Sequence, residues 1–490
     1  MKDYKLTVGL EIHAELKTKT KMFCDSKNDP DEKRPNVNIC PICMGHPGTL
    51  PVINKEAVKH VLKVGVAVGG MIADFTEFDR KNYFYPDIPK GYQISQYKYP
   101  LVSGGKLNGV EITRVHLEED TGTSLHEEGD YSLLNYNRAG VPLMELVTEP
   151  VIHSAKEAGD FAKELQLLLR SLGVAEANME KGEMRVEANI SVSTDPKKFG
   201  TKVEVKNLNS FRAVEKAIEF EMQRHIDALE AGEKISQETR GWDETKESTY
   251  SQRSKEDSHD YRYFPDPDLP KLHISQIPEF QIDVLQKEIG ELPQAKRERY
   301  KKDFGLKDED VEIYITMPEW GTYFEAVIND FGHPMSKSLG SSLSKLAVIA
   351  SNYITSDLMG LVKKDPETWA KKPISDKNFS ALIKMIGEGK IGSRAAKDIL
   401  AIMYMEATSL DGEAKDPAKI AEEKGMLQKN DEGELKKIIE KIITENPKVV
   451  ADFKSGKEAA LQFLLGQAMK ATRGYANPEV LKKLFKEQIL

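Results

Sequence analysis

Hydrophobic and polar residues alternate along several short segments in the first part of the chain. In residues 6–16, LTVGLEIHAEL, every second position is apolar, and the positions between include Glu11, His13 and Glu15. A period of two is typical of a β-strand with one buried face. The same reasoning predicts further strands at residues 109–120, 142–150, 184–193 and 201–207.

Helical patterns lie between these strands and dominate later in the chain. Residues 153–173 and 210–232 are expected to be helices, and Ser210 is placed as the N-cap of the second. Near the end, Asn477 followed by Pro478 is a typical helix start. In residues 456–474 the apolar positions that recur at helical spacing are Leu461, Leu464, Leu465, Ala468 and Met469.

The order of these elements predicts three domains. Residues 1–290 mix strands and helices, which indicates an α+β fold. Residues 291–407 show helical patterns without alternation and are expected to form an all-α domain. A loop rich in Gly, Asp and Lys near residue 408 separates a helical tail, residues 408–490.

Composition narrows the class of protein. The chain has 490 residues, which is too long for one ordinary core, and no apolar run approaches the ~20 residues that a membrane span needs. Its only three cysteines cluster within residues 24–43, so we expect a reducing, cytoplasmic location rather than a disulfide framework. The net charge of −9 gives no electrostatic sign of nucleic-acid binding, so such a role needs other support.

Three of the expected strands carry ionisable residues inside apolar sequence. Glu11 and His13 lie in the first, Glu145 lies between two apolar residues of another, and the segment RVHLEEDTG, residues 114–122, adds a histidine and three carboxylates. A buried carboxylate is costly unless it is paired or bound to metal. Each strand alone is compatible with a solvated face, but the three together favour a site for Mg²⁺ or Mn²⁺.

Residues 78–97, FDRKNYFYPDIPKGYQISQY, interleave aromatic rings with Arg80, Lys81 and Lys90. Such a segment suits a nucleotide or another anionic ligand. An ordinary loop packed by aromatic side chains fits the same composition equally well.

Cys40 and Cys43 form a C-x-x-C motif, and Cys24 lies upstream. Three cysteines are one ligand short of a closed tetrahedral zinc site. His46 or Asp25 could complete the site, and a metal-free turn is an equal alternative.

The segment MSKS, residues 335–338, resembles the nucleotide-binding loop of class I aminoacyl-tRNA synthetases. The His-Ile-Gly-His partner motif of that class is absent, and no phosphate-binding glycine motif occurs. We therefore interpret MSKS as an interhelical loop or a helix start, and a synthetase is an unfavoured alternative.

Long motifs, in order and over nearly the whole chain, resemble the B-subunit family of aspartyl/glutamyl-tRNA amidotransferases. They include VGLEIHAELKTKTKMFC, CPICMGHPGTLPVINKEAV, FDRKNYFYPDIPKGYQISQY, HLEEDTG, NYNRAGVPLMELVTEP, KVEVKNLNSFRAVEKAIEFE and DYRYFPDPDLP, and continue in the tail with SGKEAALQFLLGQAMKATRGYANPEVL.

The resemblance implies an enzyme, a ligase that uses ATP and Mg²⁺. It would phosphorylate the side-chain carboxylate of misacylated Glu-tRNA(Gln) or Asp-tRNA(Asn), and ammonia would then displace the phosphate. An amidase partner, known in this family as the A subunit, would release the ammonia from glutamine, and the small C subunit would join both into a heterotrimer. The first domain would be a cradle similar to the catalytic fold of glutamine synthetase. The helical domains would hold the tRNA, the tail being YqeY-like.

The resemblance also implies roles for particular residues. The metal ligands would be Glu11, His13, Glu119 and Glu145. The catalytic residues would be Glu119, Arg138 and Lys81, and the nucleotide would be held by Lys81, Tyr83 and Arg138.

The chain departs from the family at the cysteines. Members with a zinc site carry C-x-C before the C-x-x-C motif, whereas here Ser26 follows Cys24 at that spacing. Zinc is therefore expected to be absent or weakly held. A tRNA-binding adaptor that has lost the chemistry is the main alternative function, although the retained carboxylates and histidine speak against it.

Overall fold

The computed structural model describes residues 4–125, 131–254, 261–332, 341–363, 374–409, 415–428, 432–472 and 476–489. They divide into two compact units, residues 1–293 and 294–490. The MSKS segment lies outside the described residues, and the predicted boundaries at 290 and 407 stay predictions.

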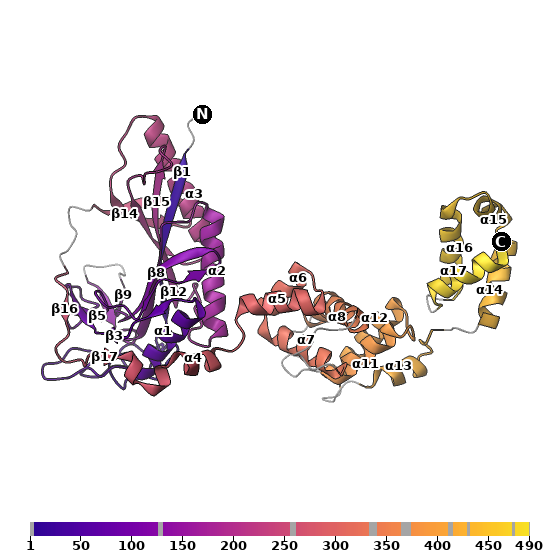
Figure 1. Ribbon diagram of the computed structural model, residues 1–490, viewed down its shortest axis with the longest axis horizontal. Helices are drawn as coiled ribbons and strands as arrows, with labels where there is room; N and C mark the ends of the chain where they lie inside the picture. Colours follow the sequence, from indigo (N-terminus) through magenta and orange to yellow (C-terminus); the bar gives the residue numbers. More distant parts are fainter. Residues whose placement is uncertain are drawn as a thin grey trace. The chain divides into compact units, whose positions relative to one another are not determined.

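The first unit is built on one large sheet (Figure 1). In the described residues its strands lie in the order β15-β14-β13-β12-β1-β11-β8-β6-β2, and β7 pairs with β8. All of the pairs are antiparallel except β13 with β14. The strands are β1 (Lys5–Glu15), β2 (Met71–Ile72), β6 (Val102–Ser103), β7 (Lys106–Leu107), β8 (Val110–Glu119), β11 (Pro142–Thr148), β12 (Met184–Ser193), β13 (Val203–Leu208), β14 (Glu238–Asp243) and β15 (Ser248–Ser254).

Strand β1 shows the predicted alternation. Its apolar residues, from Leu6 to Ala14, are almost completely buried, whereas Glu11, His13 and Glu15 are only partly buried. The apolar face contributes to one continuous core with residues of three helices, α1 (Lys55–Ala67), α2 (Ala155–Ser171) and α3 (Phe211–Glu230). The α+β class predicted for this part of the chain is confirmed.

The helix caps explain where α2 and α3 begin. Ser154 Oγ accepts a hydrogen bond from the backbone N–H of Glu157 at 3.1 Å, and Ser210 Oγ accepts one from Ala213 at 3.0 Å. Each cap satisfies an N–H group that has no partner inside its helix. The predicted N-cap at Ser210 is therefore confirmed.

A small sheet, β16-β4-β5, lies beside the large one, and β5 contacts β8. It consists of β4 (Asp79–Asn82), β5 (Tyr92–Ser95) and β16 (Phe264–Pro265). The remaining elements of the first unit are β3 (Phe75–Thr76) paired with β17 (Leu272–His273), β9 (Thr123–Leu125) paired with β10 (Leu133–Asn135), the short helices η2 (Ile274–Gln276) and η3 (Pro278–Phe280), and α4 (Ile282–Ile289).

The described part of the second unit is helical. Its helices are α5 (Pro293–Phe304), which starts at the unit boundary, α6 (Asp308–Thr316), α7 (Pro318–Asp330), α8 (Ser341–Asn352), the π-helix η4 (Tyr353–Leu358), α9 (Met359–Val362), α11 (Asp376–Gly387), α12 (Ser393–Ser409), α13 (Pro417–Glu423), α14 (Glu432–Glu445), α15 (Pro447–Lys454), α16 (Glu458–Ala471) and α17 (Pro478–Ile489).

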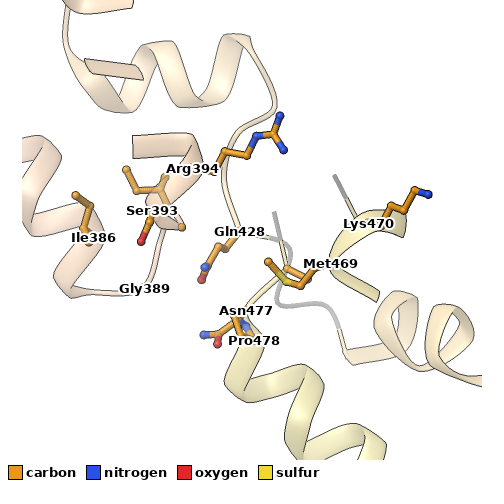
Figure 2. Close-up of a pocket in the computed structure, with 12 residues that line it drawn as sticks. Ile386, Gly389, Ser393, Arg394, Gln428, Met469, Lys470, Asn477 and Pro478 are labelled. Carbon is orange, nitrogen blue, oxygen red and sulfur yellow. The ribbon is translucent and has the colours of Figure 1, made fainter. Parts of the chain in front are cut away.

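Helices α14, α16 and α17 share a small core of their own. Leu461, Leu464 and Ala468 of α16 are buried in it, as the spacing predicted. A pocket of about 700 Å³ within this unit is lined by residues of α11, α12, α16 and α17 (Figure 2). None of the helices in the described residues is long and apolar enough to cross a membrane.

Candidate active site

Strands β1, β11 and β8 bring ionisable side chains together in one row. Pairing of β1 with β11 sets His13 opposite Glu145, and pairing of β11 with β8 sets Glu145 opposite His116. Residues that face each other across neighbouring strands project to the same side of a sheet. Glu118 lies two positions after His116, so alternation returns its side chain to this side.

His13 lies at the centre of the row. Its Nε2 is 3.4 Å from Oε2 of Glu145 and 3.7 Å from Oε1 of Glu118. One ligand atom of each of these three residues lies within 4.8 Å of the others. We call His13, Glu118 and Glu145 the inner group.

A second set of three, the outer group, shares His13 and adds Glu11 and Glu187, again within 4.8 Å of one another. Glu187 comes from β12, where it pairs with Glu11 across the strands. Lys206 Nζ on β13 donates to Oε2 of Glu187 at 2.7 Å. The inner group is more deeply buried, because the Glu118 and Glu145 side chains are 4% and 8% exposed and that of Glu11 is 28% exposed.

The close packing of these groups shifts their pKa values. Burial lowers the pKa of His13, but its hydrogen bond to Glu145 and nearby carboxylate charges outweigh this and raise it. Burial also lowers the pKa of His116, but the charge of Glu145 outweighs it and raises the pKa to about 9. Burial and the charge of Glu145 raise the pKa of Glu11 to about 7. Without a metal the cluster therefore retains protons, which a cation has to displace.

The donor atoms of the inner group are those that suit a hard divalent cation. Carboxylate oxygens are the usual ligands of Mg²⁺, and one imidazole among them also suits Mn²⁺. The residues present therefore fit the cation that the sequence predicted.

Glu119, a predicted metal ligand, is not brought into either group. Its carboxylate forms an ion pair with Lys90 and accepts a hydrogen bond from the backbone N–H of Ile94 at 2.9 Å. Consecutive residues of a strand point to opposite faces, so Glu118 and Glu119 cannot both reach His13 through β8. Glu118 could have been chosen from the sequence, because it lies two positions from His116 and therefore on the same face of the strand.

Lys81 and Tyr83 lie on and just after β4. Burial lowers the pKa of Lys81, but the charge of Glu118 and other anionic groups outweigh it and raise the pKa. The Lys81 Nζ lies 5.0 Å from the centroid of the Tyr261 ring. Burial and then the charge of Glu118 raise the pKa of Tyr83. Both predicted residues therefore lie within the electrostatic reach of the inner group.

Arg138 belongs to a second ionic group. Its Nε donates to the backbone carbonyl of Thr121 at 3.1 Å and lies 3.5 Å from Oδ2 of Asp120. Arg185, which sequence reasoning missed, donates to the same Asp120 oxygen at 3.0 Å. Burial and the charge of Asp120 raise the pKa of Glu15 to about 8. Arg185 is adjacent because β12 pairs with β1, a long-range pairing that leaves no local sequence signal.

The three cysteine sulfurs lie within 4.8 Å of one another. Ser26 Oγ is 4.0 Å from the Cys43 sulfur, where a fourth thiolate would complete a zinc site. The Lys21 Nζ is also 4.0 Å from the Cys43 sulfur, and burial lowers the pKa of this lysine. Residues at this turn therefore offer three thiols, one ligand short of a closed tetrahedral zinc site.

Comparison with known proteins also indicates a catalytic domain in the first unit. Residues 6–278 match the family described as the GatB/GatE catalytic domain, and residues 339–489 match the family described as the GatB domain.

Curated relatives match the chain over almost its full length. The B subunit of aspartyl/glutamyl-tRNA(Asn/Gln) amidotransferase from Thermodesulfovibrio yellowstonii is 42% identical, with 98% of each chain covered, and that from Carboxydothermus hydrogenoformans is 39% identical, with 100% of this chain and 99% of the relative covered. The protein of the same name in Thermotoga maritima is 41% identical, over 99% of this chain and 98% of the relative. The chain belongs to the family of amidotransferase B subunits.

Proposed function

We propose that this chain is the catalytic B subunit of a tRNA-dependent amidotransferase that acts on Glu-tRNA(Gln), Asp-tRNA(Asn) or both. It would transfer a phosphoryl group from ATP to the side-chain carboxylate, and ammonia would displace the phosphate to form the amide. Because a carbon–nitrogen bond is made with glutamine as the amide donor, the enzyme would be a ligase. The observation that carries this proposal is the inner group, His13 with Glu118 and Glu145.

The central difficulty of this reaction is electrostatic. ATP and the acceptor carboxylate are both anions, and they must approach within bonding distance. A divalent cation held by His13, Glu118 and Glu145 would offset charge on the phosphate oxygens.

Lys81 is the best candidate for a fixed cation. Its raised pKa keeps the ammonium charged, and Glu118 and Glu145 raise that pKa through their charge rather than through a hydrogen bond. An ammonium that is held near carboxylates without a direct pair is available to an incoming phosphate. Arg138 would bind a second anionic oxygen, because its guanidinium is fixed by the carbonyls of Thr121 and Gly122.

Tyr83 is proposed to shape the nucleotide pocket. Its ring centroid lies 6.0 Å from those of both Tyr85 and Tyr261. Tyr85 is exposed, so Tyr83 and Tyr261 are the rings that would limit water near a reactive acyl phosphate, which would otherwise be hydrolysed before ammonia arrives.

The proposal includes two partner proteins and a division of labour in the chain. The relatives are named as B subunits, which supports an assembly with an amidase, the A subunit, which would release ammonia, and with a small C subunit. We propose that the large, mainly antiparallel sheet corresponds to the catalytic fold of glutamine synthetase. The helical unit, with its YqeY-like tail at 408–490, would hold the tRNA.

The test is ATP-dependent conversion of each misacylated tRNA by the reconstituted complex with ammonium as the nitrogen source. Ammonium bypasses the amidase partner, so the assay reports the step assigned to this chain. We expect conversion by the native complex and by Glu219→Gln, an exposed control on α3, and at least a 100-fold loss in Glu118→Gln. A native complex that binds both tRNAs and converts neither would favour the alternative function, a tRNA-binding adaptor without catalytic activity.

A further inference from the structure

The C-x-x-C turn has the geometry of a reactive dithiol. Cys40 and Cys43 are free thiols, and the backbone N–H of Cys40 donates to the Cys43 sulfur at 3.1 Å. Cys40 is partly open to solvent, whereas Cys43 is only 5% exposed. The Cys40 sulfur can therefore meet a small solute. The Cys43 sulfur is held beside it and accepts a hydrogen bond from the backbone.

A buried lysine stabilises the thiolate form of Cys43. The Lys21 side chain is fully buried, and its Nζ contacts the Cys43 sulfur at 4.0 Å and the carbonyl of Tyr136 at 3.2 Å. Burial lowers the pKa of Lys21, and a thiolate at Cys43 opposes this shift, because a buried ammonium is costly unless an anion neutralises it. The neighbouring Cys24 thiol and Lys21 lower the pKa of Cys43 to about 5.

We propose that Cys40 and Cys43 form a redox-active dithiol that a hydroperoxide converts reversibly into a disulfide. The hydroperoxide transfers one oxygen to the Cys40 sulfur, which becomes a sulfenic acid while an alcohol leaves. The Cys43 thiolate attacks that sulfur, the S–S bond forms, and the departing hydroxide takes up a proton to give water. Two thiols and one hydroperoxide thus yield one disulfide, one alcohol and one water.

The turn is packed against Lys90, whose partner Glu119 is the neighbour in sequence of Glu118 in the inner group. A Cβ atom on Gly45 would lie 2.6 Å from Cγ of Lys90, so the turn and Lys90 are in close contact. Lys90 is the ion-pair partner of Glu119. Closure of the disulfide would move this turn, so oxidation is expected to reduce the amidation activity. This consequence rests on the proposed function, whereas formation of the disulfide does not.

The experiment treats the full chain with hydrogen peroxide, blocks the remaining thiols by alkylation and maps the peptides by mass spectrometry. We expect the free-thiol count under denaturing conditions to fall from three to one, with Cys40 joined to Cys43, and dithiothreitol to restore it. Cys24→Ser is the matched control and should form the same disulfide. Cys40→Ser and Cys43→Ser should each form none within the C-x-x-C turn.

Three results would overturn the dithiol: a free-thiol count that stays at three, a disulfide that contains Cys24, or one tightly bound zinc per purified chain that protects the cysteines. The effect of the disulfide on amidation is tested separately. If the disulfide forms and the reconstituted Cys24→Ser complex loses ammonium-dependent conversion reversibly, the coupling between the disulfide and the active site is supported. If the disulfide forms and conversion is unchanged, the coupling to the active site is refuted and the dithiol stands.

Discussion

Glu118 and Glu119 are adjacent in sequence but are assigned different roles, and their glutamine variants test that assignment. Glu118 belongs to the inner group, so Glu118→Gln removes one of the three proposed metal ligands. Loss of a partner that only supports a ligand typically costs 10–100-fold in affinity, so loss of a ligand should weaken Mn²⁺ binding by at least about 100-fold. Glu118 also accepts a hydrogen bond from Ser95 Oγ at 3.0 Å, and despite its burial the nearby histidines hold its pKa below the usual range, so its neutralisation should also lower the free energy of unfolding.

The Glu119→Gln variant should lose stability but keep its metal binding. The side chains of Lys90 and Glu119 are 9% and 5% exposed, so neutralising Glu119 leaves a buried ammonium without its counter-charge. Breaking a buried pair in this way costs about 3–5 kcal/mol. With a urea slope of about 3 kcal/mol per molar, the unfolding midpoint should fall by about 1 M or more. Mn²⁺ affinity should stay within about threefold of native, because Glu119 lies outside both groups.

The assays are calorimetric titration with Mn²⁺ and urea unfolding followed by circular dichroism, on the same preparations. Glu219→Gln serves as the exposed control and should match the native chain in both. Mn²⁺ binding that is lost in Glu119→Gln and retained in Glu118→Gln would refute the strand-register argument for the inner group.

Four further predictions concern other contacts of the described residues. His13 must lose its proton to bind a cation, and its pKa is raised, so Mn²⁺ affinity measured by titration should increase with pH, by up to about tenfold per unit below that pKa. The folded-state pKa of His116 is raised to about 9 from its ordinary value of 6.5. The stability that this histidine contributes is therefore fully present below pH 6.5 and is lost as the pH rises through 9. Urea unfolding of the metal-free chain at several pH values would detect the loss. Ser154→Ala removes the cap of α2 and should cost about 1 kcal/mol in the same assay. Ser26→Cys supplies a fourth sulfur near Cys43, so the variant should retain zinc through dialysis, as elemental analysis would show, while native protein does not.

Local patterns were sufficient to predict the strands β1, β8, β11, β12 and β13 and the helices α2 and α3 of the first unit. The segment MRVEANISVS was predicted as a strand and forms β12 over the same residues, 184–193. The helix predicted at 210–232 is observed as Phe211–Glu230 with its expected cap. Periodicity and capping depend on residues close in sequence, which is why they could be interpreted without a tertiary structure.

The candidate site was predicted only in part. Glu11, His13 and Glu145 were singled out because charge in an apolar strand is unusual at any position. Glu187, Lys206 and Arg185 were missed, because each is an ordinary polar residue of a half-exposed strand until β12 and β13 pair beside β1.

The sequence by itself determined the central strands β1, β11, β8, β12 and β13, which face of β1 enters the core, and that ionisable side chains gather on the other face. Only the tertiary structure decided which of those side chains meet. The register between β1, β11 and β8 places Glu118 rather than Glu119 with His13, and a shift of one residue would exchange them. The physical reason is that side-chain direction along a strand is a local property, whereas the pairing of strands that are distant in sequence is set by the packing of the whole core.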